Sequence, residues 1–298
     1  MSAGVFLFFF LMLSVPRGYT PGAVILLAAG LYYCARRLPM GLSGEDKTLA
    51  WLLVALFGVG VFSYFYHDNP ARSLDLPSRY LMAVPILILL VSRPPDPKWV
   101  WSGLIFGCVS AAGVTLWQVY ALDFARAMGS TGVIQFGNLG LMMGVFCAAA
   151  AIGFFKGDQA WSPCWRLALL VGAAAGFYAS LASGSRGGWI ALPAIVIVFI
   201  AAYVSRKNVK YVAATVITLL VAAVAALSTV PAIEERVDVA LSDIQRYQAG
   251  DPNTSLGYRF DMYRSLAIII PEKPWLGWSY EDYEAEQRRL VETGQVSD

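Results

Sequence analysis

Long apolar runs separated by short polar segments occupy the first three quarters of the chain. Nine runs are long enough, or nearly so, to cross a bilayer, at about 3–16, 20–35, 48–66, 80–92, 99–120, 138–155, 166–182, 188–204 and 210–228. Because the hydrocarbon layer holds no water to satisfy a bare backbone, each run is predicted to be an α-helix. The first and fourth runs are short, so nine is an approximate number. The expected fold is an all-α polytopic membrane protein with about nine transmembrane helices.

The chain becomes polar after about residue 228. This change predicts two regions: a transmembrane helical bundle at 1–228, and an amphipathic, helical loop region at 229–298. Within the second region, 231–248 has the apolar spacing of a helix lying on a membrane surface. Residues 256–270 are predicted to form a further helix. Ser279 and Asp282 resemble a capping box that starts a last helix at about 280–292.

Composition supports a membrane protein. Hydrophobic residues make up 58% of the chain and charged residues 14%, with a mean hydropathy of +0.59. Soluble domains carry about 25% charged residues. The four cysteines show no CxxC spacing and form no cluster with the single histidine, so no zinc or redox site is indicated. We expect no metal, no cofactor and no nucleic-acid partner.

Lysine and arginine positions indicate an orientation. With a cytoplasmic N-terminus, the short inner loops between the predicted helices carry about twice as many of these residues as the short outer loops, as the positive-inside rule requires. This orientation places Arg186 and the whole region 229–298 on the outer, periplasm-like face. If one short helix does not span, the sides downstream of it exchange.

The segment SGSRGG at residues 183–188 connects two apolar runs. An arginine at the centre of a membrane helix costs about 2.5–3.5 kcal/mol, so a charge at a membrane boundary is a candidate for function. The alternative is an ordinary interhelical turn whose Arg186 side chain reaches the lipid headgroups.

Further arginines are predicted on the same face: Arg259 and Arg264, and more distantly Arg72, Arg79 and Arg126. The arginine fork matches phosphate oxygens and keeps its charge at every relevant pH. Several such side chains would suit a diphosphate whose lipid tail stays in the bilayer. The alternative is that Arg259 and Arg264 are solvated or bind anionic headgroups nonspecifically. The chain contains no GxSxG, P-loop, HExxH or Rossmann motif.

Three motifs, in this order, resemble the O-antigen ligase/O-antigen polymerase superfamily of bacterial inner-membrane glycosyltransferases. The first is NLG at 138–140, the second is SGSRGGWIAL at 183–192, and the third is YRFDMYRSLA at 258–267 followed by PWLG at 274–277. In that family the last block marks the large periplasmic loop and ends in G-x-G, where this chain has Ser279 in place of the second glycine.

The resemblance implies transfer of a glycan from undecaprenyl diphosphate to a hydroxyl of lipid A–core, on the periplasmic face of the inner membrane and without metal. It implies that Arg186 and Arg259, which match the motifs, bind the diphosphate. We add Arg264 as a third candidate ligand, and Ser185, Gly187 and Gly188 as candidates for the supporting turn. The partners implied are the lipid-linked donor, the lipid A–core acceptor and membrane lipids.

The catalytic base stays unassigned. In the family, a histidine late in the periplasmic loop would take the acceptor proton. This sequence stops at Asp298 before such a residue, so we expect a C-terminal truncation, and little transfer if these residues are the entire protein. His67 lies in an early loop and is interpreted as an ordinary interfacial histidine.

Other functions stay open. O-antigen polymerases and protein O-oligosaccharyltransferases share the same motifs. A lipid-linked-oligosaccharide transporter or a noncatalytic membrane scaffold belongs to a different class. A transporter would favour acidic or basic pairs within the membrane, and the apolar runs contain none.

Overall fold

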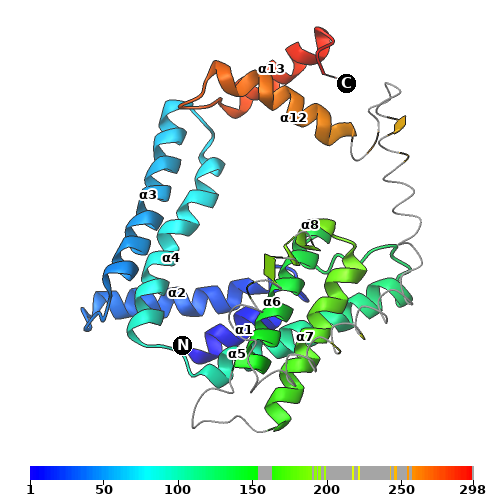
Figure 1. Ribbon diagram of the computed structural model, residues 1–298. Coiled ribbons are helices and arrows are strands. Elements are labelled where there is room, and N and C mark those ends of the chain that lie inside the picture. The colour runs from blue at the N-terminus through cyan, green and yellow to red at the C-terminus, as the bar shows by residue number, and fades with distance from the viewer. Residues whose placement is uncertain are drawn as a thin grey trace. The chain divides into compact units, whose positions relative to one another are not determined.

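The computed structural model (Figure 1) describes residues 1–153, 163–189 and 257–296, together with isolated positions between 191 and 254. Regular structure in these residues is entirely helical, with no strand. The prediction of an all-α protein is therefore confirmed for this part of the chain. The surface helix predicted at 231–248 lies outside the described residues.

Within the described residues, five helical segments are long and apolar enough to cross a membrane. They are α3 (Gly44–Tyr66), η1 with α4 (Ala71–Leu74 and Asp75–Ser92), α5 with η2 (Pro97–Leu116 and Trp117–Ala121), α6 (Val133–Gly153) and α7 (Pro163–Ser183). Each overlaps a predicted span, although α4 and α6 each begin about five residues before the predicted run. The eighth and ninth predicted spans fall almost entirely outside the described residues, so the total of about nine stays a prediction.

The first two helices are shorter, with α1 at Ser2–Leu11 and α2 at Tyr19–Ala35. At 1.5 Å per residue, the ten residues of α1 extend about 15 Å, half of the roughly 30 Å hydrocarbon layer. The predicted helix at 3–16 is thus shortened. Leu13 is fully buried and Ser14 Oγ donates a hydrogen bond to Ser110 Oγ at 2.6 Å, and Pro16 disfavours a helical conformation at the residue before it.

Helices α6 and α7 approach closely through glycines. A Cβ atom added to Gly176 would lie 2.6 Å from the carbonyl oxygen of Gly140, and one added to Gly144 would lie 3.1 Å from that of Ala173. Small residues of this kind let membrane helices pack backbone to backbone. The small-xxx-small spacing from Gly172 to Gly176 is therefore used as a helix contact, and it places the end of α7 beside the start of α6.

The chain divides into two compact units. One contains 1–41 and 88–231, and the other contains 42–87 and 232–298. The second unit thus joins the α3–η1–α4 hairpin to the C-terminal region. The predicted boundary at 228/229 lies outside the described residues and stays a prediction.

Two C-terminal helices occur where the sequence predicts them: α12 (Gly257–Ile269), followed by η3 (Ile270–Glu272), and α13 (Tyr280–Glu292). Ser279 Oγ accepts a hydrogen bond from the backbone N–H of Asp282 at 3.0 Å, which is half of the predicted capping box. The Asp282 carboxylate lies 3.6 Å from Lys273 Nζ. The two helices lie side by side (Figure 1). Gln287 Nε2 on α13 donates to Ser265 Oγ on α12 at 2.9 Å.

Candidate functional site

The turn after α7 is held by its own serines. Gly184 has a φ of +63°, a left-handed conformation that glycine adopts without steric cost. Ser183 Oγ donates to the Ser180 carbonyl at 2.7 Å and accepts from the backbone N–H of Ser185 at 3.2 Å. Ser185 is itself buried, and its Oγ donates to Asn138 Oδ1 on α6 at 3.1 Å. The turn is therefore fixed to both neighbouring helices.

A second fixed point comes from Arg126, in the loop before α6. Its Nε donates to the Ser183 carbonyl at 2.8 Å, and its second guanidinium nitrogen donates to the Gly184 carbonyl at 2.9 Å. A cation at this position satisfies the last carbonyls of α7 and complements the negative end of the helix dipole. Arg126 therefore positions the turn, and these two donors are not available to a ligand.

The loop that carries Arg126 is organised by Gln118, a buried polar residue in η2. Its Oε1 accepts from the backbone N–H groups of Met128 and Gly129, both at 2.9 Å, and its Nε2 donates to the Gly129 carbonyl at 2.9 Å. Sequence reasoning did not identify this role. A glutamine at the end of an apolar run could have predicted it, because a buried side-chain amide is nearly always hydrogen-bonded.

The glycines of the turn differ in what surrounds them. A Cβ atom added to Gly188 would lie 2.7 Å from Asn138 Oδ1, whereas one added to Gly187 would meet nothing within 4 Å. On α6, a Cβ atom added to Gly137 would lie 2.1 Å from Ser183 Oγ. A larger side chain would therefore clash at Gly137 and Gly188 but not at Gly187. Arg186 begins the short helix α8 (Arg186–Trp189), and its side chain lies outside the described part of the structure.

The other two predicted diphosphate ligands lie on α12, where both side chains are exposed. The buried face of this helix contains Gly257, Asp261, Ser265 and Ile269. At 100° per residue, Arg259 lies about 160° around the helix from Asp261, and Arg264 lies about 60° from it. The two arginines are thus about 140° apart. Arg186 and Arg259 belong to different units, and their convergence on one ligand stays a prediction.

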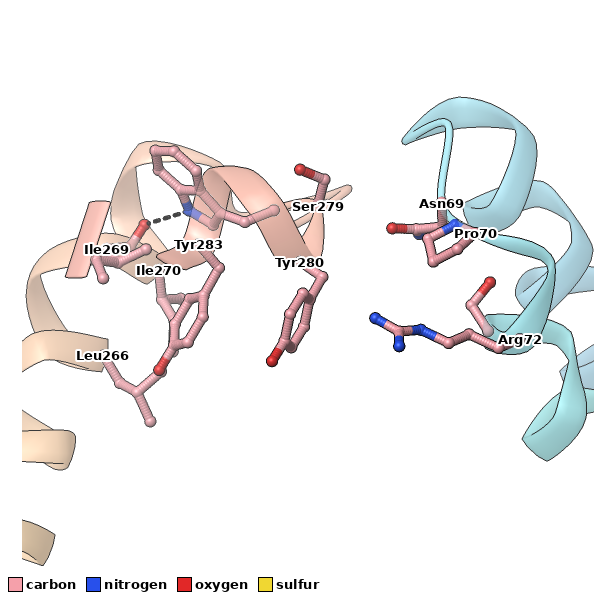
Figure 2. A pocket seen from close by; sticks show the side chains of 11 residues that line it. Asn69, Pro70, Arg72, Leu266, Ile269, Ile270, Ser279, Tyr280 and Tyr283 are labelled. Carbon is pink, nitrogen blue, oxygen red and sulfur yellow. Dashed lines mark hydrogen bonds between the residues drawn. The ribbon is translucent and has the colours of Figure 1, made fainter. Parts of the chain in front are cut away.

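A cleft of about 720 Å³ opens within the second unit, between the start of the α3–α4 connection and the α12–α13 pair (Figure 2). We call it the Arg72–Tyr280 cleft. Asn69 and Arg72 lie on one wall, and Leu266, Ile270, Tyr280 and Tyr283 lie on the other. Figure 2 shows the Arg72 guanidinium facing the Tyr280 ring across the opening. Sequence reasoning did not bring these segments together, because about 200 residues separate them.

The charges around this cleft are unevenly paired. Arg79 forms an ion pair with Asp75 at 2.5 Å, whereas no carboxylate among the described residues pairs with Arg72. The pKa of the Tyr280 phenol is raised above its ordinary value, chiefly by its hydrogen bond with Glu284 and then by the negative charge of that group; Arg72 acts in the opposite direction. The Arg72 guanidinium and a phenol whose pKa is raised by a nearby carboxylate therefore face one another.

The segment PWLG at 274–277 lies against the end of α3. His67, which caps this helix, places Nε2 2.9 Å from the Leu276 carbonyl oxygen. Because a carbonyl can only accept, the imidazole Nε2–H is the donor. Lys273 Nζ lies 3.9 Å from the centre of the Trp278 ring, and Trp278 Nε1 donates to the Ile269 carbonyl at 3.1 Å. His67 thus positions this loop, and its place at a membrane interface stays a prediction.

No group of three or more histidine, cysteine, aspartate or glutamate side chains in the described ranges is arranged to hold a metal ion.

Comparison with known proteins gives two matches. The family model described as O-antigen ligase matches residues 167–297, a range that includes the turn after α7 and both C-terminal helices. An uncharacterized protein of Haemophilus influenzae (strain ATCC 51907 / DSM 11121 / KW20 / Rd) is 32% identical over 302 residues. That alignment covers 98% of this chain and 73% of the relative.

Proposed function

This chain belongs to the O-antigen ligase family, and from that premise we propose that it transfers a glycan from undecaprenyl diphosphate to a hydroxyl of lipid A–core. Members of the family are glycosyltransferase-like enzymes, and the five long apolar helices make this a multi-pass bacterial membrane protein. We place the reaction on the periplasmic face of the inner membrane, in agreement with the distribution of lysine and arginine. O-antigen polymerase and protein O-oligosaccharyltransferase are the alternatives within the family.

The observation that carries this proposal is the construction of the turn before Arg186. Asn138 holds Ser185 through one hydrogen bond, and Arg126 holds the carbonyls of Ser183 and Gly184 through two. A plain connection between two membrane helices does not need three hydrogen bonds from a neighbouring helix and a separate loop to fix it. The arrangement suits a backbone that must present the next side chain, Arg186, in one place.

In the proposed reaction, the acceptor hydroxyl oxygen forms a bond to the anomeric carbon of the donor sugar. The bond from that carbon to the diphosphate oxygen breaks, and the diphosphate leaves with the electron pair. Arg186 and Arg259 stabilise the charge that develops on the leaving group through charge-assisted hydrogen bonds. Arg264, which lies about 140° from Arg259 on α12, contributes less. The hydroxyl proton goes to a base that we do not assign, because His67 Nε2–H is engaged with Leu276.

The test is a transfer assay with the full-length protein in nanodiscs, a defined undecaprenyl-diphosphate-linked glycan and purified lipid A–core, with product followed by mass spectrometry. Loss of one charged hydrogen-bond partner costs about 1.5–3 kcal/mol, so Arg186→Ala and Arg259→Ala should each lower kcat/KM roughly 10- to 150-fold. Arg264→Ala should lower it less than tenfold. Arg93→Ala, on an exposed arginine at the end of α4 that is predicted to face the cytoplasm, is the matched control.

Normal transfer by both Arg186→Ala and Arg259→Ala, at normal expression, would refute the proposed roles. A transporter would move the lipid-linked glycan across the bilayer without forming product, and a scaffold would be unaffected by either substitution. Replacing lipid A–core by free repeat units, or by an acceptor protein, distinguishes the ligase from the other two family activities.

A further inference from the structure

The Arg72–Tyr280 cleft is separate from the residues proposed to bind the diphosphate. Its volume of about 720 Å³ lies within the range of about 300–1,000 Å³ that is usual for small-molecule sites. We propose that this cleft binds a sugar ring of the glycan substrates, an inference that rests on the glycosyl-transfer function proposed above.

The first argument is the pairing of apolar and polar surface. Leu266 and Ile270 form an apolar wall, and the rings of Tyr280 and Tyr283 stand beside it (Figure 2). A pyranose ring presents C–H groups on its faces and hydroxyl groups around its edge. Tyrosine combines an apolar ring with a polar tip, so it can cover a sugar face while its hydroxyl group meets the edge.

The second argument is the set of hydrogen-bonding groups opposite those rings. Arg72 offers a guanidinium with several N–H donors and has no carboxylate partner among the described residues. Asn69 Nδ2 donates to the Ser63 carbonyl at 3.3 Å. This bond does not use the amide oxygen of Asn69, which can accept a hydrogen bond from a ligand. Donors and acceptors on one wall fit hydroxyl groups, each of which can donate and accept.

The third argument distinguishes a sugar from a diphosphate. Glu284 raises the pKa of the Tyr280 phenol, so negative charge lies near the ring that faces Arg72, although Arg288 Nη2, 3.8 Å from a Glu284 carboxylate oxygen, partly offsets that charge. The carboxylate weakens the attraction of this region for a doubly charged diphosphate, whereas neutral hydroxyl groups tolerate both the guanidinium and the carboxylate. The cleft is thus matched to an uncharged, hydroxyl-rich ligand.

Binding is measured by saturation-transfer NMR and by titration calorimetry on the full-length protein in nanodiscs. The probes are two free oligosaccharides: the core oligosaccharide released from lipid A, and the lipid-free O-antigen repeat. Arg72→Ala and Tyr280→Ala should each weaken binding of one of these probes by roughly tenfold. The probe that responds identifies the source of the sugar as acceptor or donor. Tyr280→Phe, which keeps the ring and loses the hydroxyl group, should have a smaller effect.

Two controls accompany these variants. Arg79→Ala removes a nearby arginine that is already paired with Asp75, and Tyr120→Ala removes an exposed tyrosine of the other unit. Both should bind as the wild type does. Because Arg72 and Tyr280 are themselves exposed, thermal melting should be unchanged in all four alanine variants.

In the transfer assay, Arg72→Ala and Tyr280→Ala should raise KM for the same glycan about tenfold and leave kcat within about twofold. Equal affinity of wild type, Arg72→Ala and Tyr280→Ala for both oligosaccharides would overturn the proposal, and so would absence of binding by the wild type. Contact of Arg72 with anionic phospholipid in place of sugar would also overturn it. Oligosaccharide binding that is lost in Arg72→Ala while no variant transfers glycan would support the cleft and refute only the proposed reaction.

Discussion

Replacing Arg126 by alanine tests the construction of the turn most directly. The substitution removes two hydrogen bonds, at 2.8 and 2.9 Å, from the carbonyls of Ser183 and Gly184. Hydrogen bonds to a charged group contribute about 1.5–3 kcal/mol each when desolvated. Because the Arg126 side chain is exposed and water can replace it, we reduce the combined loss to about 1–2 kcal/mol. A change of this size lowers Tm by about 2–8 °C in a protein larger than 150 residues.

Arg126→Lys should lose about half as much, since an ammonium cannot reach both carbonyls with the geometry of a guanidinium fork. Leu122→Ala, an exposed position in the same loop, is the control and should melt as the wild type does. The assay is thermal unfolding in nanodiscs followed by tryptophan fluorescence, with glycan transfer measured in parallel. If the turn presents Arg186 as proposed, a displacement of about 1 Å lowers transfer up to roughly 100-fold.

A double mutant decides whether Arg126 acts through the turn. Gly184 has a φ of +63°, so Gly184→Ala should by itself cost about 1–2 kcal/mol. Once that substitution has distorted the turn, loss of Arg126 should cost less than it does in the wild type. Strict additivity within about 0.5 kcal/mol, or an unchanged Tm in Arg126→Ala, would refute the reasoning.

Two further predictions follow from the described contacts. Gly137→Ala should destabilise the protein by about 1–3 kcal/mol, because its new methyl group would overlap Ser183 Oγ, whereas Gly187→Ala, which meets nothing within 4 Å, should be neutral in the same melting assay. The hydrogen-bonded ion pair with Arg289 lowers the pKa of Glu286 from its ordinary value of 4.5. The ion pair therefore stabilises the folded protein fully above pH 4.5, and this stabilisation is lost as the pH falls through the pKa that Glu286 has in the folded protein. Glu286→Gln should flatten the fall in Tm between pH 6 and pH 3, and an unchanged pH profile would contradict this.

The helices of this protein follow from local sequence. Apolar runs bounded by polar residues predict α5 and α7 closely and α3 and α6 to within about five residues, and Ser279 predicts the start of α13. The end of α1 differs from the prediction. The residues after Leu11 continue the apolar run, but Pro16 disfavours helix at the residue before it, and Leu13 and Ser14 are held by packing and by the bond to Ser110.

The site was less predictable than the fold. The motif at 183–188 identified the turn, but not that Arg126 and Gln118 hold it from a loop more than fifty residues earlier. Arg126 was expected to be a distant member of a phosphate-binding group, and in the structure its donors bind backbone carbonyls. The Arg72–Tyr280 cleft depends on a contact between segments about 200 residues apart, which no periodicity in the chain encodes.

The glycine contact between α6 and α7 also links the turn to the way these two helices pack. Gly137 and Gly140 lie on either side of Asn138, so the register that brings the two helices together also brings the Asn138 amide to Ser185. A slip of one residue along this pair would move the amide 1.5 Å and rotate it 100°, which would break the hydrogen bond. Membrane helices adjust to bilayer thickness by tilting. A change in acyl-chain length that alters the tilt of α6 relative to α7 should therefore weaken the hydrogen bond between Asn138 and Ser185, because the close glycine contacts leave no space for the helices to shift separately.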